Sequence, residues 1–561
     1  MCPDSPLLDQ PATAGTSDIE TAPESQDPLA PLPDGELAAE VARRRTFAII
    51  SHPDAGKTTL TEKLLLYGGA IHLAGSVKAR RAQRHATSDW MKLEQERGIS
   101  VTSSVMQFDY AGCRVNLLDT PGHGDFGEDT YRTLIAADSA VMLLDNRRGV
   151  EERTRQLFDV CKRRRIPIFT FVNKCDRVGE DPLKLVSDVE AELGIACYAA
   201  NWPIFAGATF VGVYDRRHDV VHLFDRDTDH GSHRGGAVVG GLDDPRVRER
   251  LDDAAIARLT DELSLLDEAG HPFDEEMLRS GALTPVYFGS ALTNFGVEPF
   301  LEAFVKLAPS PQPRMAGDVL VEPTDPAFTG FVFKIQANMD PRHRDRVAFV
   351  RVCSGRFTAG MEVRLARTGK RVRLAAPQQF LARERVAVEE AWPGDVVGII
   401  DRGSLRIGDT LADRADVEFA EIPRFAPEHF ARIVITDPMR RKQLDTGLRQ
   451  LTEEGAAQVF FPDAVAGTVP LVGAVGQLQF DVMLHRLEHE YGVPARLEGF
   501  PFRHPRWVTG PAADINRVAG GSGVQLLRDA KGNAVMVFAD SFSVRWITDR
   551  ETSIKFADRA P

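Results

Sequence analysis

The sequence lacks long hydrophobic runs and paired cysteines. No stretch of 18 or more apolar residues occurs among its 561 residues, which excludes a membrane-spanning helix of ordinary length. Its six cysteines are scattered and form no C-x-x-C motif: Cys2, Cys113, Cys161, Cys175, Cys197 and Cys353. This pattern favours reduced, mostly buried thiols and argues against a disulfide framework or a zinc site.

Basic residues are also fewer than acidic residues. Lysine and arginine number 68 against 81 aspartate and glutamate residues, so the net charge is −13. Such a balance argues against DNA binding and against any large surface for nonspecific nucleic-acid binding, but it is compatible with a local basic face. The dense basic run KARRAQRH, residues 78–85, is either a solvated loop or a surface that meets the phosphates of a large RNA.

The N-terminal residues contain neither the basic nor the apolar region of a signal peptide. They are acidic and rich in proline, alanine and serine, which predicts a disordered tail over residues 1–38. The length predicts three or four domains, and an apolar content of 43% supplies several buried cores.

Five continuous apolar runs, alternating with helical patterns, occupy residues 46–51, 113–119, 139–145, 166–172 and 285–289. Such runs, each followed by a helix, are typical of buried parallel strands in an α/β sheet. We therefore expect one α/β domain over residues 39–312. The stretch between the last two runs predicts an insertion around residues 198–280 that carries a mobile loop, DRDTDHGSHRGG.

The pattern of apolar and polar residues changes after the proline-rich stretch at residues 309–313. Such a stretch is typical of a linker. Short, closely spaced strand patterns with glycine turns predict a β-barrel over residues 313–416. Strand and helix patterns mix again over residues 417–547, which predicts a third domain of α/β type. Residues 548–561 are expected to form a C-terminal tail.

The stretch SHPDAGKT fits the phosphate-loop pattern G-x-x-x-x-G-K-[ST], except that Ser51 replaces the first glycine. It follows an apolar strand and opens a helix, the context that the motif requires. Backbone N–H groups would surround the phosphates, Lys57 would reach the β and γ oxygens, and the Thr58 hydroxyl would bind Mg²⁺. The alternative is an ordinary strand–turn–helix. The expected nucleotide contacts are Ser51, His52, Pro53, Asp54, Ala55, Gly56, Lys57, Thr58 and Thr59.

A second motif, DTPGH, ends an apolar strand at residues 119–123. Asp119 can hold Mg²⁺ through water, and the Gly122 N–H can sense a γ-phosphate. His123 lies where GTPases place the residue that orients the attacking water, so it is the expected catalytic residue. Taken alone, the tetrad also fits an ordinary turn. The expected contacts are Asp119, Thr120, Pro121, Gly122 and His123.

A third motif, NKCD at residues 173–176, would select the base. Guanine offers an N1–H and an N2 amine side by side, which a carboxylate accepts and adenine lacks, so Asp176 favours GTP over ATP. The expected base contacts are Asn173, Lys174, Cys175 and Asp176, with Ser290, Ala291 and Leu292 near guanine O6. Three motifs in this order, each at a strand end, predict a site for GTP or GDP.

A switch loop is expected at ERGISV, residues 96–101, between the first two motifs. The Ser100 hydroxyl can complete the Mg²⁺ shell while GTP is bound and release it after hydrolysis. The expected metal ligands are therefore Thr58, Ser100 and Asp119. A serine that caps a helix or ends a strand is the alternative interpretation of Ser100.

With GKTT, RGIS, DTPGH and NKCD in this order, the chain resembles the translational GTPases. It is most similar to the class II bacterial release factors, the peptide-chain release factor 3 family, in phrases spanning residues 44–500. The resemblance implies a cytoplasmic, monomeric GTPase domain–barrel–α/β protein. Such factors bind the ribosome after peptide release, help to eject the class I release factor, hydrolyse GTP and leave. It also implies that large-subunit ribosomal RNA positions His123.

Two positions depart from the family pattern. Ser100 stands where elongation factors carry threonine, and Gly124 stands where an acidic residue is typical. The latter would loosen the second switch while leaving Asp119, Gly122 and His123 intact.

Other functional classes fit less well. Elongation factor G and the ribosome-protection proteins carry two further domains, but only about 150 residues follow the barrel here. A class I release factor needs a Gly-Gly-Gln tip, which the sequence lacks. His123 disfavours a GTP-gated binding protein that hardly hydrolyses GTP, and Asp176 disfavours an adenine-nucleotide enzyme.

Overall fold

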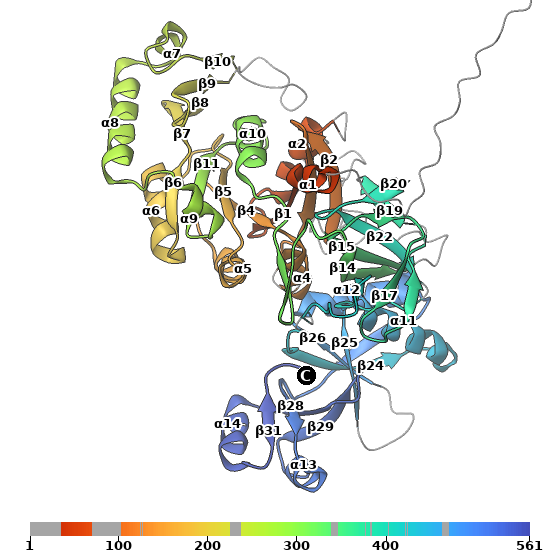
Figure 1. The fold of residues 1–561 in the computed structure, drawn as a ribbon. Helices are drawn as coiled ribbons and strands as arrows, with labels where there is room; N and C mark the ends of the chain where they lie inside the picture. The colour runs from red at the N-terminus through yellow and green to blue at the C-terminus, as the bar shows by residue number, and fades with distance from the viewer. Residues whose placement is uncertain are drawn as a thin grey trace, which may run out of the picture.

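The computed structural model describes residues 35–69, 103–224 except 124 and 126, 237–337, 346–462 except 376, 382, 383, 402, 421 and 423, and 470–560. These residues form three units along the chain, each with its own sheet (Figure 1). Residues 1–34 of the expected tail, the basic run, Ser100, Gly124 and the loop at 225–236 lie outside the described residues. Residues 36–38, also expected in the tail, begin helix α1 (Glu36–Ala42).

The first unit is built on a seven-stranded sheet. Its spatial order is β2 (Ser104–Tyr110), β3 (Cys113–Asp119), β1 (Arg44–Ser51), β4 (Ser139–Asp145), β5 (Ile168–Asn173), β11 (Leu283–Phe288) and β6 (Ala196–Ala199). The five strands expected from the apolar runs pair in parallel, so the parallel-sheet prediction is confirmed. The edge strand β2 runs antiparallel to β3. The carboxyl ends of the parallel strands therefore meet at one edge.

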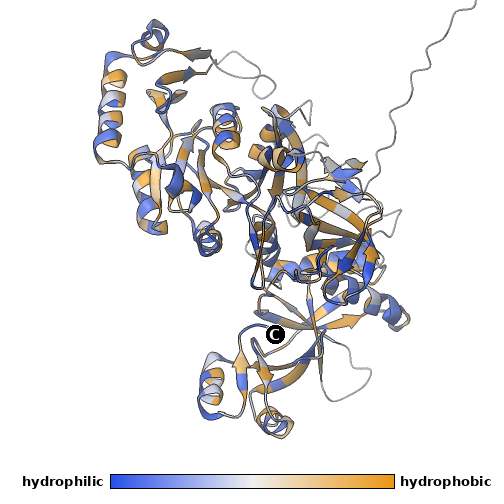
Figure 2. Ribbon diagram, in the orientation of Figure 1, coloured by the Kyte–Doolittle hydropathy of each residue, from blue (hydrophilic) through white to orange (hydrophobic). Residues whose placement is uncertain are grey.

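Helices cover both faces of this sheet. Successive side chains of a strand point to opposite faces, so β1 contributes to two cores. Phe47 shares a core with residues of α2 (Lys57–Tyr67) and α10 (Val297–Leu307). The core on the other face contains residues of α4 (Gly127–Ala136), α5 (Glu152–Arg163) and α6 (Pro182–Leu193). Figure 2 shows hydrophobic and hydrophilic residues mixed along the helices, as this packing requires.

The insertion forms a separate four-stranded antiparallel sheet. Its order is β10 (Ala237–Val239), β9 (Val220–Leu223), β8 (Thr209–Asp215) and β7 (Asn201–Ala206). The helices that follow are α7 (Pro245–Arg250), α8 (Asp253–Ala269) and α9 (Glu275–Arg279). The buried Trp202 donates from Nε1 to Glu262 Oε2 at 2.8 Å, which fixes α8 against β7. Residues 198 and 199 belong to β6 of the main sheet, so the separate sheet begins two residues after that strand ends.

The second unit is an antiparallel sheet that curves into a half-barrel. Its order is β18 (Arg371–Arg373), β17 (Glu362–Leu365), β23 (Thr410–Ala412), β14 (Thr329–Ala337), β15 (Arg346–Ser354), β22 (Val396–Asp401), β19 (Pro377–Leu381) and β20 (Glu384–Ala387). Two short pairs accompany it: β12 (Arg314–Ala316) with β13 (Val319–Val321), and β16 (Phe357–Thr358) with β21 (Glu390–Ala391).

The third unit has the expected α/β character. Its eight-stranded sheet has the order β27 (Ala495–Gly499), β24 (His429–Ile435), β26 (Leu471–Ala474), β25 (Gln458–Pro462), β29 (Val524–Asp529), β30 (Ala534–Phe538), β28 (His504–Thr509) and β31 (Lys555–Ala557). Its helices are the 3₁₀ turn η2 (Pro438–Arg440), α11 (Arg441–Glu453), α12 (Gln477–His489), α13 (Ala512–Ala519) and α14 (Ser541–Arg550).

The end of the chain differs from the expected tail over 548–561. Helix α14 continues to Arg550, and β31 pairs antiparallel with β28. A three-residue strand is too short to give a periodic signal in the sequence. Its pairing with a strand some fifty residues earlier comes from tertiary structure.

Buried charges join the first two units. Arg351 of β15 pairs with Asp138, which immediately precedes β4, and both side chains are 1% exposed. Arg44 of β1 donates from Nε to Asp395 Oδ2 at 2.8 Å. Removing one partner of such a pair leaves a buried charge without compensation, so these contacts hold the two units in one orientation.

The described helices and cysteines agree with the composition. None of the helices in the described ranges combines the length and the apolar character needed to cross a membrane. The five described cysteines are free thiols; four are buried and Cys113 is half-buried. The prediction of mostly buried cysteines is confirmed for these five.

Candidate nucleotide-binding site

The phosphate-loop sequence forms a tight turn between β1 and α2. β1 ends at Ser51, and Gly56 caps the start of α2 with a φ of 99°. Asp54 also has a positive φ, 66°. The first four N–H groups of a helix have no partner within the helix, so the start of α2 presents hydrogen-bond donors and the positive end of its dipole. Such a helix start is suited to binding phosphate.

The first two motifs meet through a buried ion pair. Lys57 Nζ donates to Asp119 Oδ1 at 2.5 Å, and the two side chains are 7% and 1% exposed. Asp119 ends β3 directly beside Ile49 of β1. Thr120 donates from Oγ1 to the Ile49 carbonyl at 2.5 Å. The parallel pairing of β1 and β3 therefore fixes the two motifs against each other.

His123 lies at the rim of the site, with 41% of its side chain exposed. Its Nδ1 lies 3.3 Å from the backbone N of Asp125 and 3.2 Å from Asp125 Oδ1. Residue 125 therefore fixes the orientation of this ring through both its backbone and its carboxylate. Pro121 is buried and Gly122 is half-buried beside it.

A contact from the third unit reaches this motif. The N–H of Leu478, at the start of α12, donates to Asp125 Oδ2 at 2.6 Å. A Cβ at Gly476 would overlap the Asp125 side chain. Asp125 therefore connects His123 to α12, and the sequence analysis missed this role because the two partners are 353 residues apart.

Asn173 ties three loops together. Its Nδ2 donates to the Ala55 carbonyl at 2.8 Å, and its Oδ1 accepts from the Ala291 N–H at 2.9 Å. Ala55 belongs to the phosphate loop and Ala291 to the stretch expected near guanine O6. A single side chain at the end of β5 thus positions two other parts of the candidate site.

Asp176 is held in place by the same stretch. Ser290 donates from Oγ to Asp176 Oδ1 at 2.6 Å. The Ser290 N–H in turn donates to the Phe295 carbonyl at 2.8 Å, which anchors the loop. The neighbouring Cys175 is buried, and burial raises the pKa of its thiol to about 12. Cys175 therefore contributes packing, and its thiol stays protonated at neutral pH.

Lys174 lies across the phosphate loop. Its Nζ donates to the Asp54 carbonyl and, at 2.7 Å, to Asp145 Oδ2. Burial alone would raise the pKa of Asp145, but the hydrogen bonds from Lys174 and the Arg147 N–H hold it below its usual range. Asp145 ends β4 and was not singled out in the sequence. Its position at the carboxyl end of an apolar run was the available signal.

The loop has the chemistry of a ligand site. Ser51 Oγ and His52 Nδ1 are buried and have no hydrogen-bond partner among the described residues. Buried polar atoms are nearly always paired, so two such atoms in one loop fit a site whose partners come from a ligand. The Thr58 hydroxyl and the Asp119 carboxylate are oxygen donors of the kind that Mg²⁺ prefers.

The structure therefore brings the three motifs and the 290–292 stretch to one edge of the sheet. Pro53 and Thr59 lie half-exposed in the phosphate loop and first turn of α2, and Leu292 is half-buried next to Ala291. Ser100, the expected third metal ligand, lies outside the described residues.

Substituting Gly56 by alanine is expected to weaken GDP binding by at least about tenfold. The new Cβ would overlap the Asn173 side-chain amide, and alanine at a φ of 99° costs roughly 1–2 kcal/mol. The Asn173 bridge between the loops would then have to move. Isothermal titration with GDP measures the effect.

Gly112→Ala provides the matched control for this change. Gly112 also has a positive φ, 79°, but a Cβ there meets nothing within 4 Å. It lies in the turn between β2 and β3. Equal losses of GDP affinity in the two variants would show that backbone strain, and not the contact with Asn173, is responsible.

Family models match the chain in three consecutive parts. Residues 42–310 match the elongation factor Tu GTP-binding domain, and residues 327–414 match domain 2 of elongation factor G. Residues 419–548 match the C-terminal domain of class II release factors. The three matches follow the three units of the structure.

Similar proteins include two curated relatives that match along nearly their whole length. A peptide chain release factor 3 of Symbiobacterium thermophilum is 55% identical over 93% of this chain and 98% of its own. One of Gloeobacter violaceus is 53% identical, covering 94% and 99%. A crystal structure of a Thermus thermophilus protein has a TM-score of 0.66 at 26% identity, and covers 88% of this chain and 72% of its own.

Proposed function

The chain belongs to the peptide chain release factor 3 family, and on this basis we propose how its residues act in translation termination. It is a GTPase with a translational GTP-binding domain. We propose that it acts in the cytoplasm as a monomer, and that it promotes the dissociation and recycling of class I release factors after peptide release.

Guanine selection depends on Asp176. Its carboxylate, held by Ser290, accepts the N1–H and N2 amine of guanine, and Asn173 keeps this loop against the phosphate loop. This linkage is the observation that carries the proposal of a guanine-nucleotide site. An adenine nucleotide would leave the Asp176 carboxylate without the two donors that guanine supplies.

Phosphate binding depends on the loop at residues 51–59. Lys57 turns from Asp119 toward the β and γ phosphates, and the N–H groups at the start of α2 surround them. Thr58, Asp119 and Ser100 are the proposed ligands of Mg²⁺, which neutralises phosphate charge when it is bound.

Hydrolysis depends on His123. Its Nε2 is proposed to orient the attacking water, while Asp125 fixes the opposite side of the ring. Ribosomal RNA of the large subunit is proposed to complete this arrangement, so that hydrolysis is slow away from the ribosome. A partner that supplies a preorganised group commonly accelerates GTPases by about 10³ to 10⁵.

The contact between Asp125 and Leu478 supports a route from hydrolysis to the rest of the molecule. A change at the second motif alters what the start of α12 can bind. We propose that the barrel and third unit convert this local change into a lower affinity for the ribosome. Class I release factors are therefore functional partners, displaced while GTP is bound.

Multiple-turnover peptide release tests this function. Termination complexes would receive limiting class I release factor and GTP, with and without this protein. A GTP-dependent rise in turnover is expected for the wild-type chain, and little or none for Lys57→Ala. Lys57 is the buried phosphate-loop lysine, so the variant loses the phosphate contact and the ion pair between Lys57 and Asp119.

Lys184→Ala is the matched control, because Lys184 is exposed on α6 and pairs only with Glu180 at the surface in the described contacts. It should retain the full effect. If the wild-type chain hydrolyses GTP rapidly on ribosomes without raising release turnover, it is a translational GTPase with another task, in elongation or ribosome rescue.

A further inference from the structure

A cavity of about 820 Å³ lies at the edge of the main sheet opposite the nucleotide motifs. Its walls contain the beginning of β1, the residues before β4, β5 and β11, and the linker after α10. β4 alone has seven residues, which places the two edges roughly 20 Å apart at about 3.3 Å per residue. Whatever enters this cavity is therefore separate from the GTP site.

Positive charge dominates the lining of the cavity. Six of its side chains are cationic: Arg45, Arg164, Arg165, Arg279, Lys306 and Arg314. Asp138 is the single acidic residue among the lining residues. Its carboxylate pairs with the buried Arg351, accepts the Gln312 N–H at 3.3 Å and lies 3.7 Å from Arg314 Nη2, so it is shared among several partners. The chain as a whole is acidic, so this excess is local.

Neutral carbonyl groups hold the two least exposed cations in place. Arg45 donates to the carbonyls of Val305 at 3.0 Å and Ala42 at 2.7 Å. Arg314 donates to the Ile135 carbonyl at 2.7 Å. Carbonyl groups satisfy N–H donors without cancelling a charge, and the one carboxylate near Arg314, that of Asp138 at 3.7 Å, is shared with Arg351. Burial lowers the pKa of both guanidinium groups; for Arg314 the charges of Arg351 and Arg164 lower it further, while Cys353 and Asp138 oppose this shift.

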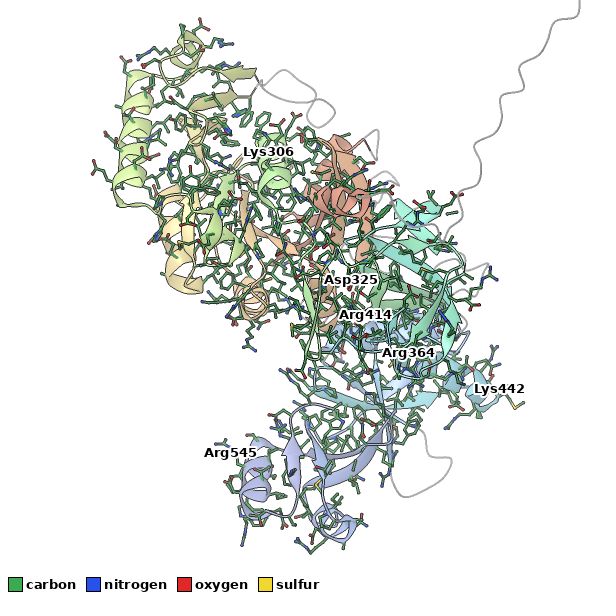
Figure 3. The ribbon with its side chains drawn as sticks, in the orientation of Figure 1. Lys306, Asp325, Arg364, Arg414, Lys442 and Arg545 are labelled. Atoms are coloured by element: carbon green, nitrogen blue, oxygen red, sulfur yellow. The ribbon has the colours of Figure 1, made fainter. Side chains whose placement is uncertain are left out.

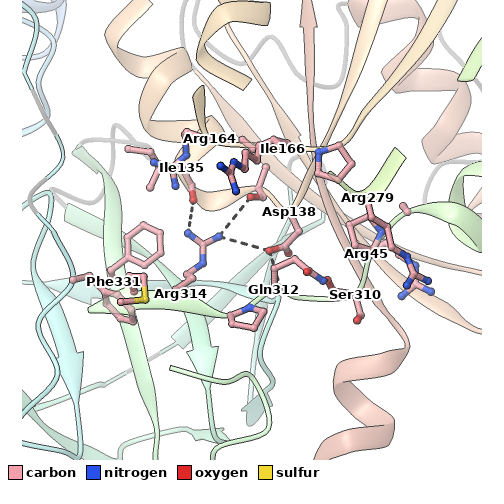
Figure 4. Close-up of a pocket in the computed structure, with 18 of the residues that line it drawn as sticks. Arg45, Ile135, Asp138, Arg164, Ile166, Arg279, Ser310, Gln312, Arg314 and Phe331 are labelled. Carbon is pink, nitrogen blue, oxygen red and sulfur yellow. Dashed lines mark hydrogen bonds and ion pairs between the residues drawn. The ribbon is translucent and has the colours of Figure 1, made fainter. Parts of the chain in front are cut away.

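The wall of the cavity that faces Arg45 and Arg279 is apolar. Phe331 and Phe419 meet edge to face with their centroids 5.8 Å apart, and the Arg314 guanidinium lies 5.2 Å from the Phe331 centroid. Figure 4 shows Phe331 on one side of the pocket and Arg45 and Arg279 on the other. The volume lies within the usual range for small-molecule sites. A ligand that fits has both an aromatic part and negative charge.

We propose that this cavity binds a nucleotide, with its phosphates against the arginines and lysine and its base against Phe331 and Phe419. Arginine forms paired hydrogen bonds with phosphate oxygens, and its planar group also stacks on aromatic rings. The ligand would contact the GTPase domain, the linker and the barrel together. The proposal does not depend on the function of the GTP site.

Binding of ATP to the full-length chain saturated with GDP tests the proposal. ATP is the chosen probe because GDP fills the guanine site and Asp176 rejects adenine there. Equilibrium dialysis with radiolabelled ATP is expected to give one bound ATP per chain, unchanged when GDP is raised tenfold. The double variant Arg164→Glu/Lys306→Glu should bind ATP at least about tenfold more weakly.

Both substituted side chains are exposed, so the variant should fold normally and bind GDP as the wild type does. Lys442→Glu/Arg545→Glu makes the same change of charge on α11 and α14, far from the cavity (Figure 3), and should leave ATP binding unchanged. No binding of ATP, displacement of ATP by GDP, or equal losses in the two double variants would overturn the proposal. So would binding of a single-stranded RNA, but not of ATP, that depends on Arg164 and Lys306; the cavity wall would then be an RNA contact.

Discussion

Replacing His123 by alanine is expected to lower ribosome-stimulated GTP hydrolysis by about 10² to 10⁴, the usual contribution of a positioned side chain in proton transfer or water orientation. Binding of GTP and GDP should change by less than about twofold, because the ring lies at the rim of the site with its Nδ1 facing Asp125. Single-turnover hydrolysis on programmed ribosomes, with nucleotide titrations alongside, separates the two effects.

The control for this experiment is His218→Ala. His218 is an exposed histidine of the insertion whose ring pairs with Asp215 at 2.8 Å, and the variant should hydrolyse GTP at the wild-type rate. Unchanged hydrolysis in His123→Ala would show that another group orients the water. A loss of hydrolysis accompanied by an equal loss of GTP affinity would place His123 in nucleotide binding.

The sequence predicted those parts of the site whose signal lies in a short continuous stretch, namely a motif directly after an apolar run. Each motif follows an apolar run, and parallel strands bring their carboxyl ends to one edge. Spacing within a motif then places donors such as Lys57 next to the edge. The same arrangement brings the loops at this edge close together, so that Asn173 can bond both to the phosphate loop and to the stretch at residues 290–292.

The parts that the sequence did not predict depend on contacts between distant residues. Asp125 lies two residues after the second motif, but its role depends on the contact with Leu478 in another unit. Asp138 resembles any polar residue before a strand until Arg351 and Arg314 are placed around it. No periodicity within a single segment encodes such a pair, because the contact arises from how whole units dock.

The cavity illustrates the same limit from the opposite edge of the sheet. Its cations come from segments at residues 45, 164–165, 279, 306 and 314, which lie far apart in the sequence. They converge because the amino ends of parallel strands also share an edge. A motif search finds the loops at the carboxyl edge, whereas the chemistry of the amino edge appears only after folding.

Replacing Asp176 by asparagine is expected to weaken GTP binding by at least about 100-fold and to create a preference for xanthosine triphosphate. The new amide N–H₂ and the guanine N2 amine are both hydrogen-bond donors. The N2 amine therefore loses its acceptor and faces another donor. Xanthine has a carbonyl at C2, which the amide N–H can reach, while Oδ1 still accepts from N1–H. The Ser290 hydroxyl can donate to the amide oxygen as it does to the carboxylate at 2.6 Å, so the loop should keep its shape.

Competition against a fluorescent GDP analogue on the wild-type and variant chains measures the exchange of preference. Asp159→Asn, on the exposed face of α5, removes the same charge away from the site and should change neither affinity. Recovery of binding by the xanthine nucleotide is the decisive observation, because a misfolded loop would lose both nucleotides equally. Equal losses would mean that Asp176 supports the loop through Ser290 and does not read the base.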